Sequence, residues 1–175
     1  MRFLEPELPV IALFDLDDTL ASTGILSKHR HNKVALDLEE VFRVEHLSAY
    51  SGMGDALTSL EQCMTLGIVT NSARWYAEQL LKNLFPYIAF DPIVTYDDVN
   101  HLKPDPESLS LAMRLANCRP EGAVFIGNSL CDHQAAGAAG VRFLGAGWSD
   151  DRSYPAVEGV EVDTPAALVH ILGAS

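Results

Sequence analysis

The sequence predicts an α/β protein built on a parallel sheet. Short apolar runs of strand length recur along the chain, and segments with helical spacing of apolar residues separate them. Strands that alternate with helices form parallel sheets joined by right-handed crossovers. The first run, residues 10–14, ends at the carboxylates of Asp15, Asp17 and Asp18. Ligands gather at the carboxyl ends of parallel strands, so these acids are candidate functional groups, although an acidic turn explains them equally well when they are taken alone.

Length, charge and cysteine content limit the classes of protein that fit. At 175 residues the chain is about one domain long, and we interpret residues 1–175 as a single domain. A net charge of −12 argues against binding to nucleic acid. No apolar run approaches the roughly 20 residues that span a bilayer, and residues 1–6 lack the pattern of an export signal. Three scattered cysteines predict reduced thiols and a cytoplasmic location.

Residues 21–62 follow the acidic strand end and carry the weakest signal. A basic patch at 27–33 precedes an amphipathic stretch that runs to Val44, which is typical of a helix, with a hairpin flap as the alternative. His29 and His31 have a spacing that metal ligands can use, but no nearby residue completes a set. A solvated basic face is the simpler interpretation, and contact with an anionic substrate stays open. A short helix is expected from Asp55 onward.

The second apolar run, residues 63–69, ends at Thr70, Asn71 and Ser72. A helix is predicted over 73–84, and its expected packing residues are Trp75, Leu80, Leu81 and Leu84. Polar groups at a strand end that opens a helix form a natural cradle for an anion. A helix cap at Asn71 or Ser72 is the alternative.

The third run, residues 91–95, is followed by a loop that contains Lys103. Asp105 is placed to cap the next helix, with Pro106 at its first position and Glu107 at the positive end of its dipole. A lone lysine before a helix is ordinarily a surface residue. Lys103 is a candidate site residue only because other polar residues also follow strands.

Three further strands are predicted at 123–126, 141–144 and 160–162. Asn128 and Asp132 follow the first of these, and a helix of small residues ends at Gly140. A final helix is expected after Thr164. Carboxylate, hydroxyl, ammonium and amide groups therefore follow four different strands.

This set of strand-end residues resembles the haloacid dehalogenase-like superfamily, most closely its phosphoglycolate-phosphatase-like branch. The four motifs of the superfamily are matched in order by residues 15–20, 69–72, 103–107 and 126–132. The resemblance implies a Rossmann-like three-layer α/β/α core with a parallel sheet. It also implies that residues 21–62 form a reduced cap or flap inserted after the first strand.

The resemblance implies a Mg²⁺-dependent phosphatase that hydrolyses a small phosphorylated metabolite through an aspartyl-phosphate on Asp15. Asp17 would act as the general acid and base, and Asp18 would serve the turn or the outer electrostatics. The implied catalytic residues are Asp15, Asp17, Thr70 and Lys103. The implied substrate contacts are Leu16, Thr70, Asn71 and Lys103. The implied Mg²⁺ ligands are Asp15, Asp17, Asn128 and Asp132.

Two departures from the family pattern bear on function. Asn128 stands where the family ordinarily has an aspartate, so we expect weak metal binding that Asp132 partly rescues. The cap is smaller than in many relatives, which favours larger substrates or a lid from a second subunit. Substrate identity and oligomeric state are therefore left open.

Three rival functions follow from the same residues. Asn128 and the reduced cap favour a weakened family member that binds a phosphorylated ligand or a protein without turnover. Carbon–halogen hydrolysis is disfavoured, because dehalogenases of this superfamily ordinarily lack an acid at the position of Asp17. Phosphoryl transfer to a second sugar hydroxyl, as in mutases, stays open, although it ordinarily requires a fuller cap.

Overall fold

A computed structural model describes residues 10–30, 47–153 and 161–173. The strands are β1 (Ile11–Phe14), β2 (Thr65–Val69), β3 (Phe90–Val94), β4 (Ala123–Gly127), β5 (Arg142–Ala146) and β6 (Glu161–Val162). The α-helices are α2 (Met53–Leu60), α3 (Arg74–Leu84), α4 (Glu107–Leu115), α5 (Leu130–Ala139) and α6 (Pro165–Ile171). The 3-10 helices are η1 (Gly24–His29), η2 (Tyr96–Asp98) and η3 (Pro120–Gly122).

The six strands form one sheet in the order β3-β2-β1-β4-β5-β6, and all the paired strands are parallel. The central strand β1 pairs with β2 and β4, so that Phe14 lies beside Ile68 and Ile126. This register ends the three strands at the same edge of the sheet. The loops that leave β1, β2 and β4 therefore meet there, as the sequence predicts.

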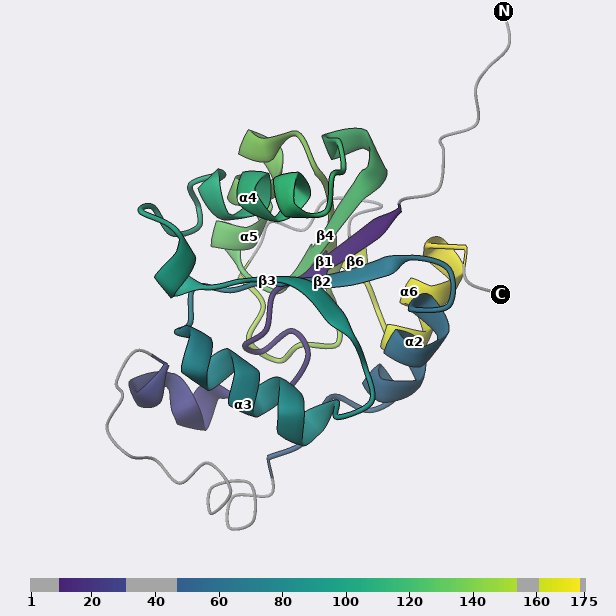
Figure 1. Ribbon diagram of the computed structural model, residues 1–175. Helices are drawn as coiled ribbons and strands as arrows, with labels where there is room; N and C mark the ends of the chain where they lie inside the picture. Colours follow the sequence, from purple (N-terminus) through teal and green to yellow (C-terminus); the bar gives the residue numbers. More distant parts are fainter. Residues whose placement is uncertain (1–9, 31–46, 154–160, 174–175) are drawn as a thin grey trace, which may run out of the picture.

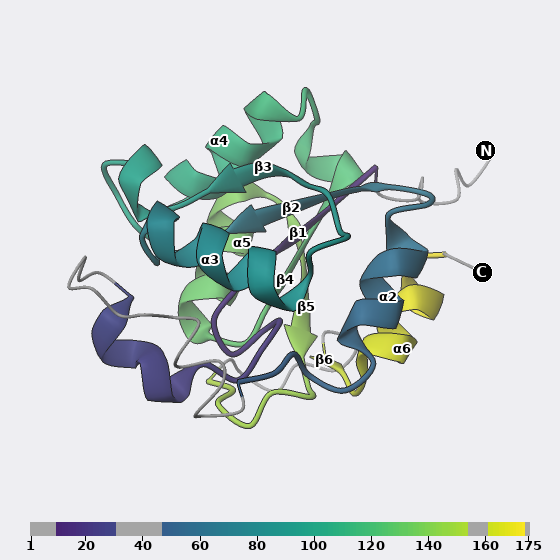
Figure 2. The ribbon, with the colours of Figure 1, turned by 60° about the horizontal axis from the view of Figure 1, so that its bottom comes forward.

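Helices cover both faces of the sheet (Figures 1 and 2). Helices α2, α3 and α6 lie over one face, and their buried side chains share a core cluster with Phe14, Ile68 and Ile126. Helices α4 and α5 lie over the other face, where Leu109 and Ala135 pack with Phe125 in a second cluster. The predicted three-layer Rossmann-like fold is confirmed.

Among the described residues, the predicted strands and helices are present, with boundaries that differ by one or two residues. The largest difference in packing is at α3, where Tyr76 is fully buried and was not among the expected packing residues. Trp75 and Leu84, which were expected to pack, are only partly buried against the core. Because Tyr76 and Leu80 are four residues apart, they share the inward face of the helix.

The predicted insert, residues 21–62, contains both a loop near the pocket and a helix of the core. Helix α2 packs against α6 and β2, and its Leu57 and Leu60 are fully buried. This helix therefore belongs to the layer under the sheet, and the boundaries of the cap stay a prediction. The proposed amphipathic helix or flap beyond residue 33 and the ring of His31 lie outside the described residues.

The ends of the helices follow the expected capping chemistry. Gly140 ends α5 with a φ of 70°, in the left-handed region that favours glycine. Thr164 caps α6 by accepting a hydrogen bond from the Ala167 N–H. Helix α4 begins at Glu107, one residue later than expected, and Asp105 accepts a hydrogen bond from the Glu107 N–H. No helix among the described residues is long and apolar enough to cross a membrane.

Candidate active site

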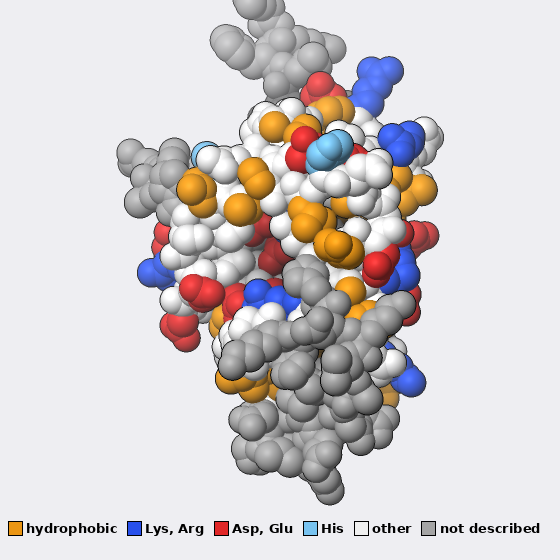
Figure 3. Space-filling model, turned by 90° about the vertical axis from the view of Figure 1, so that its left-hand side faces the viewer, with side chains coloured by type: hydrophobic (Ala, Val, Ile, Leu, Met, Phe, Trp, Pro, Cys, Tyr) orange, Lys and Arg blue, Asp and Glu red, His pale blue; other side chains and the backbone are white. Residues whose placement is uncertain are grey.

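The carboxyl edge of the sheet carries a pocket of about 250 Å³. Acidic side chains are visible in a hollow on this face of the molecule (Figure 3). The lining residues are Asp15, Asp17, Asp18, Arg30, Thr70, Asn71, Ser72, Lys103, Asn128, Ser129, Cys131, Asp132, Asp151 and Ser153. The structure thus brings together every candidate site residue except Leu16, whose side chain is fully buried in the core.

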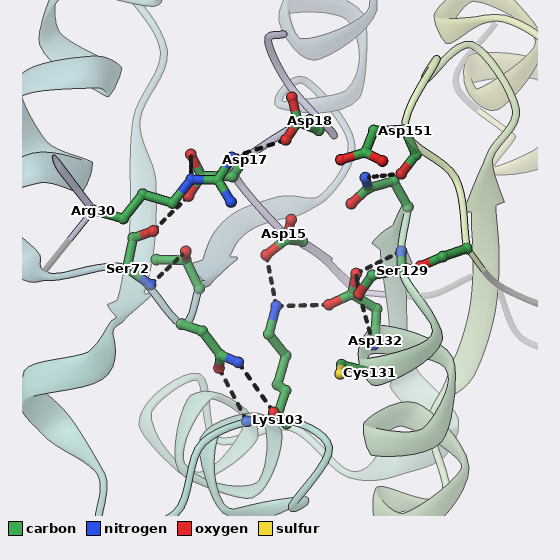
Figure 4. Close-up of a pocket in the computed structure, with 14 residues that line it drawn as sticks. Asp15, Asp17, Asp18, Arg30, Ser72, Lys103, Ser129, Cys131, Asp132 and Asp151 are labelled. Carbon is green, nitrogen blue, oxygen red and sulfur yellow. Dashed lines mark hydrogen bonds and ion pairs between the residues drawn. The ribbon is translucent and has the colours of Figure 1, made fainter. Parts of the chain in front are cut away.

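Asp15 and Lys103 form a buried ion pair at the base of the pocket (Figure 4). The Lys103 Nζ lies 2.6 Å from Asp15 Oδ1, and the exposed fractions of the two side chains are 3% and 10%. Burial raises the pKa of Asp15 to about 7, although the neighbouring ammonium opposes this change. Burial also opposes the charged form of Lys103, but the carboxylates of Asp132 and Asp15 outweigh it and raise the pKa of the ammonium. The tight contact therefore favours a charged lysine.

Asp132 shares the same ammonium and also holds the start of α5. Its Oδ1 lies 2.7 Å from Lys103 Nζ, and its Oδ2 accepts hydrogen bonds from the Ser129 N–H and hydroxyl. Ser129 in turn accepts from the Asp132 N–H, which completes a capping box. Lys103 Nζ donates a third hydrogen bond, to the Val69 carbonyl at 2.9 Å. The sequence placed Asp132 near the metal, and the structure shows both of its oxygens engaged by protein groups.

Asp17 is held by donors on both of its oxygens. Its Oδ2 accepts from the Ser72 hydroxyl at 2.5 Å. Its Oδ1 accepts from the hydroxyls of Thr23 and Tyr76, each at 2.7 Å, and lies 3.1 Å from Arg30 Nε. Tyr76, one of the buried residues of α3, therefore connects the core to the pocket. In this arrangement both carboxylate oxygens of Asp17 are engaged by these partners.

Asp18 and Arg30 form the rim of the pocket beside Asp17. Asp18 has a φ of 59°, and its Oδ1 accepts from the Thr23 N–H at 2.8 Å. Its Oδ2 lies 2.9 Å from an Arg30 guanidinium nitrogen. The Arg30 carbonyl accepts from the Ala73 N–H, which ties the end of η1 to the start of α3. This geometry supports the turn role expected for Asp18.

The loop after β2 is fixed against the loop that carries Lys103. The Asn71 amide donates to the Lys103 carbonyl at 3.0 Å and accepts from the Lys103 N–H at 3.0 Å. The Thr70 hydroxyl accepts from the Ser72 N–H at 3.1 Å. These bonds set the positions of Thr70 and Lys103 relative to Asp15. The loop after β2 and the loop after β4, which carries Asn128, lie on either side of β1.

Asn128 presents its amide oxygen to the Asp15 side of the pocket. Its Oδ1 and Asp15 Oδ2 both lie 3.2 Å from the Thr19 hydroxyl, so these two oxygens are neighbours on one side of the pocket. Its Nδ2 donates to the Asp151 carbonyl at 2.8 Å, which fixes the orientation of the amide. Neighbouring carboxylate and amide oxygens are ligands that suit a hard cation such as Mg²⁺. The five carboxylates of the lining outnumber its two cations, Arg30 and Lys103, so a bound cation is favoured further.

Several pocket residues were not predicted from the sequence. The sequence indicates a possible helix cap at Ser72 and places Arg30 in a basic patch, so both residues carry weak signals. Ser129 lies within the motif segment 126–132, and its spacing of three residues from Asp132 is that of a capping box. Asp151 and Ser153 carried no signal, because their positions depend on a loop that folds back from beyond β5 onto the end of β4.

The fold and the pocket together define a class. The protein is a Rossmann-like α/β protein whose polar residues from separate strand-end loops surround a buried carboxylate–lysine pair. This arrangement is found at the sheet edge where α/β proteins place their ligands.

The chain belongs to the haloacid dehalogenase-like hydrolase family, because the sequence model of that family matches residues 27–146. The resemblance drawn from the motifs is thereby confirmed. Asp15 and Asp17 precede the matched segment, so their assignment depends on the strand-end geometry.

Comparison with curated proteins identifies relatives that are named as phosphatases. The chain is 35% identical over 134 residues to the pyrophosphatase PpaX of Bacillus velezensis, which covers 76% of the chain and 56% of that protein. It is 28% identical over 162 residues to the phosphoglycolate phosphatase of Pseudomonas putida, covering 91% of the chain and 55% of that protein. The chain therefore spans little more than half the length of these relatives.

Solved structures share the fold at lower identity. The CbbY protein of Rhodobacter sphaeroides in complex with phosphate aligns with a TM-score of 0.71 and 22% identity, covering 92% of this chain and 96% of that one. A HAD-superfamily hydrolase from Ehrlichia chaffeensis aligns with a TM-score of 0.66 and 22% identity, covering 95% and 97%. These likenesses support the three-layer fold.

Proposed function

We propose that the protein is a Mg²⁺-dependent phosphatase in which Asp15 attacks the phosphorus atom of a phosphomonoester. The observation that carries this proposal is the contact of 2.6 Å between Asp15 and Lys103 inside the strand-end pocket. A carboxylate nucleophile needs nearby positive charge when a phosphate dianion approaches, and the buried ammonium provides it. Names of relatives such as pyrophosphatase and phosphoglycolate phosphatase support the same reaction class.

The first chemical step joins an oxygen of Asp15 to phosphorus while the bond from phosphorus to the alcohol oxygen breaks. The departing alcohol takes a proton from Asp17, which lies two residues from the nucleophile. Thr70 and the Asn71 N–H hold phosphoryl oxygens during this step. Lys103 offsets the negative charge that accumulates between Asp15 and the phosphoryl group.

The second step returns the enzyme to its starting state. Asp17 takes a proton from a water molecule, and that water attacks phosphorus. The bond between phosphorus and Asp15 breaks, and inorganic phosphate leaves. Because Ser72, Thr23, Tyr76 and Arg30 hold Asp17 in this structure, both steps require Asp17 to turn from these partners toward the pocket.

The oxygens of Asp15 and Asn128, with the backbone carbonyl of Asp17, are the groups that would hold Mg²⁺. Asp132 stays a predicted ligand of that ion. When bound, Mg²⁺ stabilises negative charge on the transferring phosphoryl group. A small phosphorylated metabolite is the proposed substrate, and the free cysteines support a location in the cytosol.

A second candidate function is the binding of a phosphorylated ligand without turnover. Asn128 brings no formal charge to the metal site, and Asp17 is fully engaged by its partners. Both observations favour a protein that retains the pocket but has lost catalytic efficiency.

A phosphate-release assay over a broad panel of phosphomonoesters, with and without Mg²⁺, separates the two candidates. We expect turnover that depends on Mg²⁺ and falls by about a thousandfold or more in Asp15→Asn. Asp150→Asn, an exposed acid outside the pocket lining, is the matched control and should retain activity. A folded protein that hydrolyses none of the panel but binds phosphate supports the second candidate.

A further inference from the structure

Asp151 is a carboxylate of the pocket that the proposed reaction does not use. It lies in the loop after β5, and it lines the pocket together with Asp15 and Asn128. Figure 4 shows its carboxylate turned toward the side of the pocket that holds Asp15 and Asp18. Its neighbour Asp150 is also exposed but does not line the pocket.

The backbone holds Asp151 beside position 128. The Asp151 carbonyl accepts from Asn128 Nδ2 at 2.8 Å, and the Asn128 carbonyl accepts from the Ser153 N–H at 2.9 Å. The Ser153 hydroxyl accepts from the Leu130 N–H at 3.3 Å. Three hydrogen bonds therefore fasten this short loop to the end of β4 and the start of α5. The backbone of Asp151 is thus fixed beside Asn128 by the fold, and its carboxylate is within the pocket lining.

Asp132 is poorly placed to replace the charge that Asn128 lacks. Its Oδ1 is paired with Lys103, and its Oδ2 accepts two hydrogen bonds from Ser129. Turning Asp132 toward a metal would break the cap of α5 and remove a charge partner from a fully buried ammonium. Each of these losses is costly in a buried site.

We propose that Asp151 supplies to the metal site the negative charge that position 128 lacks. This inference rests on the proposed function, because it concerns the same Mg²⁺ site. Cation affinity depends on the number of charged ligands, and Mg²⁺ retains several of its waters when it binds a protein. A carboxylate on the rim of the site therefore contributes either by direct ligation or through a retained water. The amide of Asn128 keeps its oxygen in the site while its nitrogen anchors the loop that brings Asp151.

The test measures Mn²⁺ binding to the full chain by the electron paramagnetic resonance signal of the free ion, without any substrate. We expect Asp151→Asn to weaken Mn²⁺ binding by about tenfold. Asp150→Asn removes the same charge one residue away, and it should change binding by less than about twofold. Equal weakening by the two substitutions would overturn the proposal, because it would indicate a general effect of surface charge.

A double substitution shows whether a carboxylate at position 128 can replace the charge that Asp151 supplies to the metal site. In the Asp151→Asn protein, a further Asn128→Asp change should restore Mn²⁺ affinity to at least the level of the unaltered chain. Failure of this rescue in a folded protein would contradict the proposal.

Asp15→Asn distinguishes failure of this inference from failure of the proposed function. If Asp15→Asn abolishes Mn²⁺ binding and Asp151→Asn does not change it, the metal site stands and the role of Asp151 is refuted. If neither substitution changes Mn²⁺ binding, the pocket is not the metal site and both proposals fail.

Discussion

Lys103 Nζ lies 2.6 Å from Asp15 Oδ1, although 88 residues separate the two along the chain. The same ammonium lies 2.7 Å from Asp132 Oδ1, so one cation pairs with two buried carboxylates, one after β1 and one in the first turn of α5. The ammonium also lies 5.2 Å from the centre of the Phe125 ring, an aromatic contact that favours a cation. Lys103 thus joins the loop before α4 to the ends of β1 and β4. The stability of the pocket and its chemistry depend on the same side chain.

Lys103→Met should destabilise the protein strongly, because it leaves two buried carboxylates without their cation. Removing one partner of a buried ion pair costs about 3–5 kcal/mol in free energy of unfolding. Urea unfolding measures this change. Lys82→Met, on the exposed side of α3, is the control and should cost less than about 0.5 kcal/mol. Equal stability of the two variants would contradict the buried ion pair.

Asp15→Asn should stabilise the metal-free protein, and the gain should depend on pH. Burial raises the pKa of Asp15 from 3.8 to about 7, so in this window the folded chain binds more protons than the unfolded chain. Stability contributed by such a group falls as pH rises, and asparagine removes this loss. The free energy of unfolding of Asp15→Asn minus that of the unaltered chain should therefore grow from pH 3.8 to about pH 7, reach about 1–3 kcal/mol and then level off. Urea unfolding in chelator at several pH values measures it, and a difference that shrinks across the window would refute the raised pKa.

Gly127→Ala should disrupt the pocket from the end of β4. A Cβ at this position would lie 2.6 Å from the Asp132 Cβ, so the side chain that pairs with Lys103 must move. We expect a loss of about 1–3 kcal/mol in stability, as for overpacking of a filled core. Gly137→Ala, on the exposed side of α5 with open space around it, is the matched control and should stabilise by about 0.5–1 kcal/mol. Thermal unfolding that ranks the two variants in the opposite order would contradict the tight contact.

Asn128→Asp should raise the affinity for Mg²⁺ by about tenfold, because it adds a charged ligand beside Asp15. Isothermal titration calorimetry with Mg²⁺ measures the change. Asn83→Asp adds the same charge on the exposed face of α3 and should leave the affinity within about twofold of its original value. Unchanged or weaker binding in Asn128→Asp would show that position 128 does not face the ion.

The sequence predicts most of this fold because its strands are short, apolar and clearly separated. Residues 11–14 and 123–126 are buried in the sheet as expected, whereas Val10, also in the first apolar run, is exposed. Gly140 and Thr164 mark helix ends through local backbone chemistry. The expected packing residues of α3 omitted Tyr76, although its spacing of four residues from Leu80 places it on the inward face of the helix. The local pattern does not encode the contact of its hydroxyl with Asp17 in a strand-end loop, because that contact is tertiary.

The candidate site was predictable where a residue directly follows a strand. Asp15, Thr70 and Asn128 are such residues, and parallel pairing brings them to one edge. Arg30 and Asp151 reach the pocket through loops whose paths depend on tertiary hydrogen bonds, such as the one from Ala73 N–H to the Arg30 carbonyl. Sequence alone contains no periodic signal for such loops.

The central claim is that Asp15 becomes covalently phosphorylated. Rapid quenching during turnover of an active phosphoester, followed by borohydride reduction, converts an aspartyl-phosphate to homoserine. Mass spectrometry of the peptide that contains residue 15 should then detect homoserine at position 15, and only when substrate and Mg²⁺ are both present. Turnover with intact aspartate at position 15 under every condition, or homoserine at a different aspartate, would contradict the account.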